Sequence, residues 1–335
     1  MHQVLFRLPD FLPGIGGAPI YGYGVMLVIG FFCAMELAKY LARRSNIDPE
    51  IFANAALIAL VAGVVGARLS HVLENLADYT RSDLSFAQNF WNAINIRTGG
   101  LTYYGGFLLA FPAVLLYGWY KKVPIRLGMD IIAPCLMIGL GFGRIGCYLN
   151  GCCYGAETSV PWAVQFPYGS DAYLEQWHEG KIQIPADLIH SNGQAWKIEE
   201  IESDRALSPE QRDHLLAEAH AQHAIAVHPA ELYSTITAWL IAAFLVAYIS
   251  IPHAPGRGFA LMLIIEGVSR FLLEEVRAEP VFTPFGRHLF GTMSYSMVLS
   301  IPIALLGVIL WFVFGSERVW KERNERPPAV QMQPT

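Results

Sequence analysis

The sequence predicts an all-α integral membrane protein with about seven transmembrane helices. Of its 335 residues, 54% are hydrophobic and 15% are charged, whereas soluble domains carry about 25% charged residues. Several apolar runs reach the length of about 20 residues that a helix needs to cross a hydrocarbon core. Because lipid offers the backbone no hydrogen bonds, each run is expected to be a helix.

Apolar runs of sufficient length define the predicted spans. They cover residues 20–41, 52–74, 100–120, 128–150, 230–251, 258–276 and 293–315. The residues before Pro19 lack the basic segment and short apolar core of a signal peptide, so no cleaved leader is expected.

Basic residues follow alternate predicted spans and indicate the orientation of the chain. They are Lys39, Arg43, Arg44, Lys121, Lys122, Arg126, Arg257, Arg318, Lys321, Arg323 and Arg326. Short cytoplasmic loops carry an excess of lysine and arginine. The N-terminus is therefore expected outside the cell membrane and the C-terminus in the cytoplasm.

A polar insertion separates the fourth and fifth predicted spans. The expected division is spans one to four over 1–155, an external insertion over 156–227, spans five to seven over 228–316 and a cytoplasmic tail over 317–335. Within the insertion, Ser208 is expected to cap a helix that runs to about His223. The insertion could be a lid, a docking element or a tolerated addition. The chain from Pro327 onward is expected to be disordered.

Charged residues inside the predicted spans are the first functional signal. They are Arg68, Arg144, Arg270, Glu274 and Arg277. The last three are spaced i, i+4, i+7, which places them on one helical face. They could form structural Arg–Glu pairs between helices. However, four arginines with one nearby carboxylate leave positive charge over, and this favours an anionic ligand such as a phospholipid headgroup.

Small residues recur every fourth position along the fourth predicted span. The stripe consists of Gly139, Gly143, Cys147, Gly151 and Gly155. Close helix packing is the simpler interpretation and is expected for Gly139 and Gly143. Polar residues interleave with the outer half of the stripe, at Arg144, Tyr148 and Asn150. A glycine-rich, polar helix end favours close approach of the backbone to a ligand.

Tyrosines beside glycines open two other predicted spans. Tyr21 and Tyr103 are expected to lie at the membrane interface, as tyrosines commonly do. Tyr23 and Tyr104 are expected to point inward.

Several stretches, taken in chain order, resemble the motifs of one known family. The longest and most specific is GRIGCYLNGCCYG at Gly143–Gly155. The others are Tyr23–Met26, Gly66–Arg68, Gly99–Gly106, His228–Tyr233, Arg270–Arg277 and Ser294–Pro302. Together they are similar to the prolipoprotein diacylglyceryl transferase family, and the likeness covers nearly all of the chain outside 156–227.

This family moves the diacylglyceryl group of phosphatidylglycerol to the thiol of the lipobox cysteine in a bacterial prolipoprotein signal peptide, and glycerol phosphate leaves. The resemblance implies a transferase of the bacterial inner membrane. Its partners would be phosphatidylglycerol, the signal peptide and the lipid bilayer. No nucleic acid, metal or other cofactor is implied. The departing phosphate needs positive charge, which Arg144 and Arg270 could supply.

The resemblance also implies roles for individual residues. The catalytic residues would be Arg144, Arg270, Tyr104 and Glu274. The substrate-binding residues would be Tyr23, Arg68, Asn150, Gly155, Tyr233 and Arg277.

Four positions depart from the family's pattern. Tyr104 stands where well-known members carry a histidine, and a phenol is a poor base near neutral pH. The acceptor of the thiol proton is therefore left open. Cys147 replaces an asparagine and Cys152 an acidic residue, while Glu266 replaces a frequent tyrosine.

Cys147, Cys152 and Cys153 allow three interpretations. They could pack as small apolar side chains, form a disulfide outside the membrane, or bind a metal with a fourth ligand such as His228. Their spacing is not a recognised zinc pattern, so packing is the preferred interpretation.

Two other functions fit parts of the sequence. Intramembrane arginines and interrupted helices also suit a transporter for an anionic solute, although the two halves show no convincing internal repeat. A non-catalytic lipid- or lipoprotein-binding paralog is favoured by Tyr104 and the cysteine substitutions.

Overall fold

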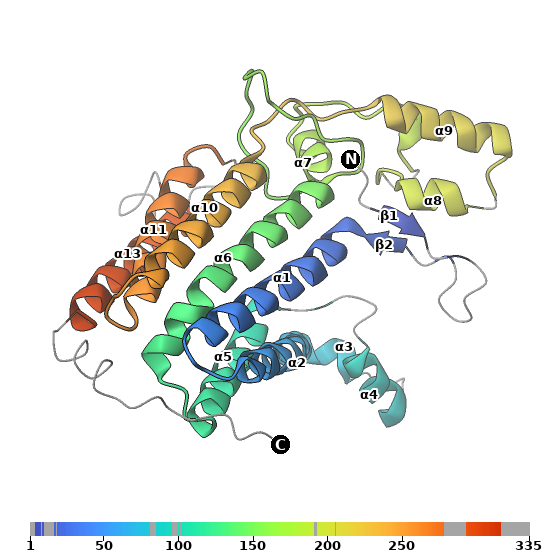
Figure 1. The fold of residues 1–335 in the computed structure, drawn as a ribbon. Helices are drawn as coiled ribbons and strands as arrows, with labels where there is room; N and C mark the ends of the chain where they lie inside the picture. Colours follow the sequence, from blue (N-terminus) through green and yellow to red (C-terminus); the bar gives the residue numbers. More distant parts are fainter. Residues whose placement is uncertain are drawn as a thin grey trace.

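The computed structural model describes residues 4–7, 9, 17, 19–80, 85–95, 100, 102–190, 193–204, 206–277 and 293–315. Helices α1, α6, α10, α11 and α13 run side by side, with α6 between α1 and α10, whereas α2 is seen nearly end-on below them (Figure 1). Helix α11 packs along α13, and α2 packs along α5. The long helices are α1 (Gly22–Arg44), α2 (Pro49–Glu74), α5 (Tyr103–Tyr120), α6 (Ile125–Asn150), α10 (Ala230–Ser250), α11 (Arg257–Glu274) and α13 (Tyr295–Val313).

Every predicted span coincides with one of these helices. Five of them, α1, α2, α6, α10 and α13, are long and apolar enough to cross a membrane, and the chain is a multi-pass membrane protein. The apolar part of α5, Gly105–Tyr120, is shorter. Helix α11 carries several charges, which lower its hydropathy.

The shorter elements lie mostly at one end of the long helices. They are β1 (Val4–Arg7), β2 (Pro19–Tyr21), α3 (Leu76–Tyr79), α4 (Phe86–Ile94), α7 (Asp171–His178), η1 (Ala186–Leu188), α8 (Ile198–Ser203) and α9 (Pro209–Ala221). The two strands pair antiparallel, a small departure from the all-α prediction.

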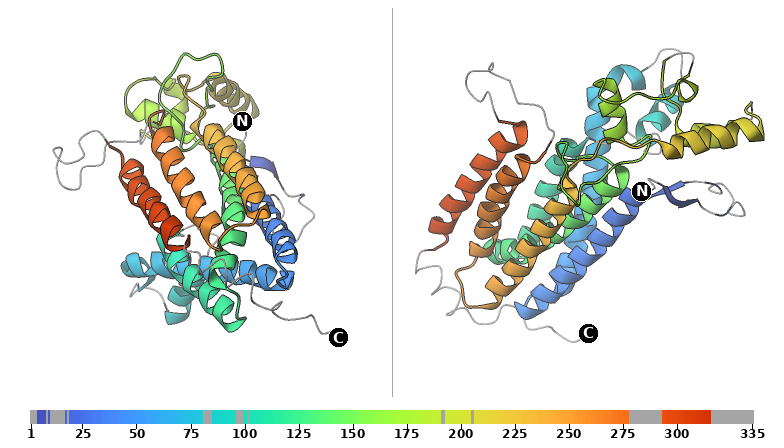
Figure 2. Two further views of the ribbon diagram at one scale, coloured as in Figure 1. Left: turned by 60° about the vertical axis from the view of Figure 1, so that its left-hand side comes forward. Right: turned by 90° about the horizontal axis from the view of Figure 1, so that it is seen from above.

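Residues 156–227 have a hydrophobic core of their own and sit across the ends of α6 and α10 (Figures 1 and 2). Its largest fully buried side chains are Phe166, Tyr173, Leu188 and Ile201. The predicted helix is confirmed as α9, where the Ser208 hydroxyl accepts from the Gln211 amide and forms a capping box.

Glycines at the helix contacts set how closely the long helices approach. A Cβ on Gly141 would lie 2.2 Å from Trp239 Nε1, and one on Gly30 would lie 2.7 Å from the Phe142 Cβ. The packing prediction is wrong at Gly139, where an added Cβ would meet no atom within 4 Å. Gly141 lies two residues further along and therefore faces a different side of the helix.

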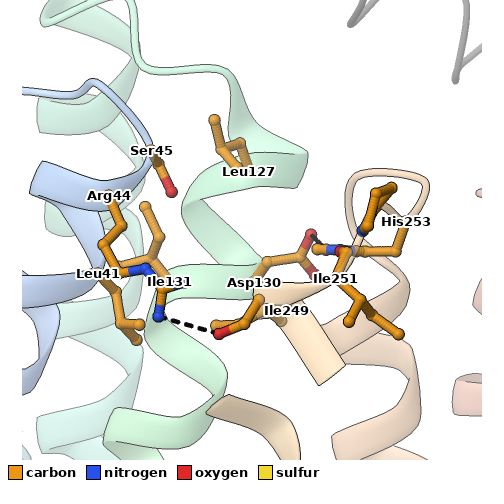
Figure 3. A pocket seen from close by; sticks show the side chains of 11 residues that line it. Leu41, Arg44, Ser45, Leu127, Asp130, Ile131, Ile249, Ile251 and His253 are labelled. Atoms are coloured by element: carbon orange, nitrogen blue, oxygen red, sulfur yellow. Dashed lines mark hydrogen bonds and ion pairs between the residues drawn. The ribbon is translucent and has the colours of Figure 1, made fainter. Parts of the chain in front are cut away.

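Asp130 ties the other end of α6 to the start of α11. Its Oδ2 accepts from the Gly256 amide at 2.7 Å and lies 3.2 Å from His253 Nε2, and its Oδ1 accepts from the Phe259 amide at 3.1 Å. Figure 3 shows Arg44, Asp130 and His253 around the adjoining cavity of about 310 Å³. This carboxylate caps a helix that otherwise begins with unsatisfied amides.

We expect Asp130→Ala to lower the unfolding free energy by about 3 kcal/mol, because it leaves buried donors without an acceptor. Thermal unfolding in detergent measures the effect. The matched control is Asp48→Ala, which removes an exposed cap at α2 and should cost about 1 kcal/mol. Equal losses in the two variants would contradict a special role for Asp130.

Candidate active site

Charged residues from three helices gather at the end of the long helices that adjoins residues 156–227. This end contains the C-terminal turns of α6 and α11 and the first turn of α10 (Figure 1). Backbone bonds hold the three segments together: the Gly155 amide donates to the His228 carbonyl, and the Ala156 amide to the Val276 carbonyl, both at 2.9 Å.

The Glu274 carboxylate is the centre of the charged group. Its side chain is 2% exposed, and its Oε2 lies 3.6 Å from Arg270 Nη2 and 3.7 Å from Arg277 Nε. Its Oε1 accepts from the Ser294 hydroxyl at 2.7 Å. Arg270 and Glu274 share a face of α11 as predicted, whereas Arg277 lies beyond the end of the helix and still approaches Glu274. One carboxylate between two guanidinium groups leaves a net positive charge.

Two hydroxyls of α13 and its N-cap complete the surroundings of this group. Ser294 donates to Glu274, and Arg270 Nη2 donates to the Ser296 hydroxyl at 2.8 Å. Packing of α11 against α13 therefore fixes the direction of the Arg270 guanidinium.

Arg144 reaches the same region from α6. It is half-buried, and its guanidinium makes no hydrogen bond or ion pair with the residues that the structure describes. Glu266 interacts electrostatically with both Arg270 and Arg144, and Glu231 with both Arg277 and Arg144. The arginines of α6 and α11 thus converge on one region, as an anion-binding site requires.

Glu231 is a site residue that the sequence analysis did not select. It opens α10 and is 1% exposed, and neither carboxylate oxygen has a hydrogen-bond partner among the described residues. The nearby Arg277 and Arg144 offset part of the cost of burying this carboxylate. Glu231 could have been selected from the sequence, because it is a carboxylate at the start of an apolar run and intramembrane charge marks functional sites.

Gly155 occupies a position that excludes any side chain. An added Cβ would lie 2.5 Å from the Val276 carbonyl oxygen and 2.6 Å from the His228 Cβ. Tyr233 stands nearby, where its hydroxyl lies 2.6 Å from Trp162 Nε1 and 3.2 Å from His228 Nδ1. The structure therefore links Gly155 and Tyr233 through His228.

Tyr23 and Asn150 lie beside the C-terminal turns of α6. Tyr23 is 41% exposed and packs on Gly146, where an added Cβ would be 2.9 Å from its ring. Asn150 is the last residue of α6, and its side chain hydrogen-bonds to Cys152.

Arg68 has well-defined structural partners. It donates to the carbonyls of Ala93 and Asn92 at 2.7 Å and of Gly100 at 3.1 Å, and its guanidinium lies 5.3 Å from the centre of the Tyr79 ring. These bonds tie α2 to the end of α4. Its binding to substrate stays a prediction. The side chain of Tyr104 lies outside the described residues, so its role stays a prediction as well.

A sequence profile of the prolipoprotein diacylglyceryl transferase family matches residues 11–313. The chain belongs to this family. The predicted resemblance is thereby confirmed, and the enzyme is a transferase.

Known members of the family are similar to this transferase over different lengths. Each relative named here is a phosphatidylglycerol–prolipoprotein diacylglyceryl transferase. The one from Clostridium tetani is 26% identical over 96% of this chain and 100% of its own length. The one from Corynebacterium diphtheriae is 28% identical over 91% and 93%. The one from Rhodopirellula baltica is 35% identical over 50% of this chain and 34% of its own length.

We expect Gly155→Ala to reduce transferase activity at least about tenfold, because the new methyl group must push the loop away from α11. Initial rates on vesicles containing the lipid substrate measure this. Gly139→Ala is the matched control, since its methyl group meets open space. Full activity of Gly155→Ala would show that this contact does not position the site.

Proposed function

We propose that this chain transfers the diacylglyceryl group of phosphatidylglycerol to the cysteine thiol of bacterial prolipoproteins. The family assignment and the names of the relatives support this reaction. The observation that carries it is the convergence of three arginines on one region: Arg270 and Arg277 flank Glu274, and Arg144 shares the neighbouring carboxylates Glu231 and Glu266 with them. This arrangement suits an anionic phosphate ester.

The reaction involves two negative charges that the site must stabilise, one on the attacking thiolate and one on the leaving phosphate. A thiolate attacks the glycerol carbon of the lipid, the bond from that carbon to the phosphate oxygen breaks, and glycerol phosphate leaves with the bonding electrons. Arg144 and Arg270 hold the growing negative charge on the phosphate. Glu274 positions Arg270 and Arg277, and its own charge keeps their burial tolerable.

The remaining predicted residues complete the proposal. Tyr104 donates a hydrogen bond to the reacting groups. The substrates bind at the C-terminal end of α6, where they contact Tyr23, Asn150, Gly155 and Tyr233. Positive charge is added by Arg277 and Arg68. The transporter and non-catalytic interpretations have no support from the family assignment.

We further propose that all seven long helices cross the bacterial inner membrane, with the N-terminus outside and the C-terminus in the cytoplasm. The basic residues at the end of α1 and between α5 and α6 support this orientation. Residues 156–227 then form an external unit between 1–155 and 228–316, and 317–335 form a cytoplasmic tail. The substrate signal peptide, with its lipobox cysteine, approaches from the same outer side.

We expect the chain to rescue growth of a bacterium depleted of its own transferase, and Arg144→Ala and Arg270→Ala to abolish the rescue. Each removes a guanidinium that stabilises the leaving phosphate, and loss of one such group costs about a hundredfold or more in rate. Arg43→Ala is the control, since Arg43 is exposed in the last turn of α1. A wild-type chain that is stably inserted in the membrane but yields no lipidated precursor would contradict the proposed transferase function.

A second expectation concerns Tyr104. Tyr104→Phe should lower kcat about tenfold with little change in KM, because only a hydrogen bond to the reacting groups is lost. Steady-state rates on lipid vesicles with a lipobox peptide measure both constants. Unchanged kcat would exclude a role for the hydroxyl.

A further inference from the structure

Three cysteines beside the site have no role in the proposed reaction. Cys147, Cys152 and Cys153 each offer a sulfur, and the three Sγ atoms all lie within 4.8 Å of one another. All are free thiols. The chain's other cysteines, Cys33 in α1 and Cys135 further along α6, lie outside this group.

The backbone turns sharply to bring these thiols together. Cys147 lies in the last turn of α6, and Gly151 ends the helix in the left-handed region at φ 74°. The Cys152 amide then donates to the Cys147 carbonyl at 3.2 Å, and Cys153 is itself left-handed at φ 65°. A left-handed conformation is uncommon for a residue with a side chain. Because Cys153 is exposed, apolar packing does not explain the arrangement.

The surroundings of the cluster suit an anionic metal centre. Three thiolates around a divalent ion carry a net charge of −1, and Cys153 interacts electrostatically with both Arg144 and Arg277. Zinc–sulfur bonds of about 2.3 Å place tetrahedral sulfurs about 3.8 Å apart, and the three Sγ atoms already lie within 4.8 Å of one another. Among the described residues, no fourth histidine, cysteine or carboxylate joins the group.

We propose that Cys147, Cys152 and Cys153 bind one thiophilic divalent ion of the Zn²⁺ type, whose fourth position is open to the acceptor thiol. Three protein ligands with one open position are typical of catalytic rather than structural zinc sites. The binding of the acceptor thiol at the fourth position rests on the proposed transferase function. A bound metal ion differs from the expectation, drawn from the sequence, that no metal takes part.

Such a centre supplies the step for which the sequence leaves no base. Loading the ion releases three protons from the three cysteines. The acceptor thiol binds at the fourth position and releases one proton to water, because a thiol bound to such an ion is deprotonated. Its sulfur then forms the bond to the glycerol carbon as the carbon–oxygen bond breaks. Glycerol phosphate leaves as the dianion beside Arg144 and Arg270. No oxidant or reductant is needed.

Metal binding is tested on the full chain purified in detergent. The background variant carries Cys33→Ser and Cys135→Ser and keeps the cluster intact, and the test variant adds Cys147→Ser, Cys152→Ser and Cys153→Ser. After equilibrium dialysis against Zn²⁺, the background should retain about one ion per chain and the test variant none. Co²⁺ should give the background a thiolate-to-cobalt charge-transfer absorption. Equal retention by both variants, or a disulfide within the cluster by intact-mass analysis, would overturn the site.

The open position is tested with a lipobox peptide. Adding it to the Co²⁺-loaded background should shift the visible cobalt bands, whereas a peptide with serine in place of its cysteine should not. Chelation should remove transferase activity and Zn²⁺ should restore it. If the ion binds but chelation leaves activity unchanged, the role of the fourth position fails and the transferase function stands. A background variant that binds Zn²⁺ and shifts with the peptide but never transfers the lipid group would instead contradict the proposed function.

Discussion

The structure depends on how positive charge is kept inside a bundle of apolar helices. An arginine away from water is expensive unless a carboxylate or an anionic ligand faces it. Glu274 faces Arg270 and Arg277 together, and Glu231 and Glu266 compensate part of what remains, including the charge of Arg144. Arg144 is the member of this group that faces no carboxylate within ion-pair distance among the described residues. A phosphate group that enters the site therefore replaces water with a full set of charged partners.

Helix α6 connects the two ends of the molecule. Asp130 anchors it to the start of α11, and Arg144 lies near its other end. Its left-handed C-cap, Gly151, leads into the cysteine loop and then to Gly155, which contacts His228 just before α10 and Val276 just after α11. The same helix therefore carries a structural anchor, a phosphate-binding arginine and the proposed metal ligands in succession.

The long helices and part of the charged site could be predicted from the sequence, because apolar length and residue spacing are local features of the chain. Apolar length predicted each long helix, and i, i+4 spacing predicted the shared face of Arg270 and Glu274, but the end of α11 before Arg277 was not predicted. Contacts between distant segments were not accessible. Nothing local shows that Arg68 binds the carbonyls at the end of α4. The left-handed turn at Cys153, which brings the thiols together, depends on a backbone angle that residue type disfavours.

The rise per residue of an α-helix relates the position of Arg144 along α6 to its depth in the membrane. Arg144 follows Asp130 by fourteen positions along α6, which corresponds to about 21 Å along its axis. In the orientation proposed above, with Asp130 at the inner edge of a hydrocarbon layer of about 30 Å, Arg144 would lie beneath the outer headgroup plane. A phospholipid bound there has to sink below its neighbours, with its glycerol backbone drawn into the apolar layer. Water is scarce at that level, so a thiolate competes there with little hydrolysis of the same ester.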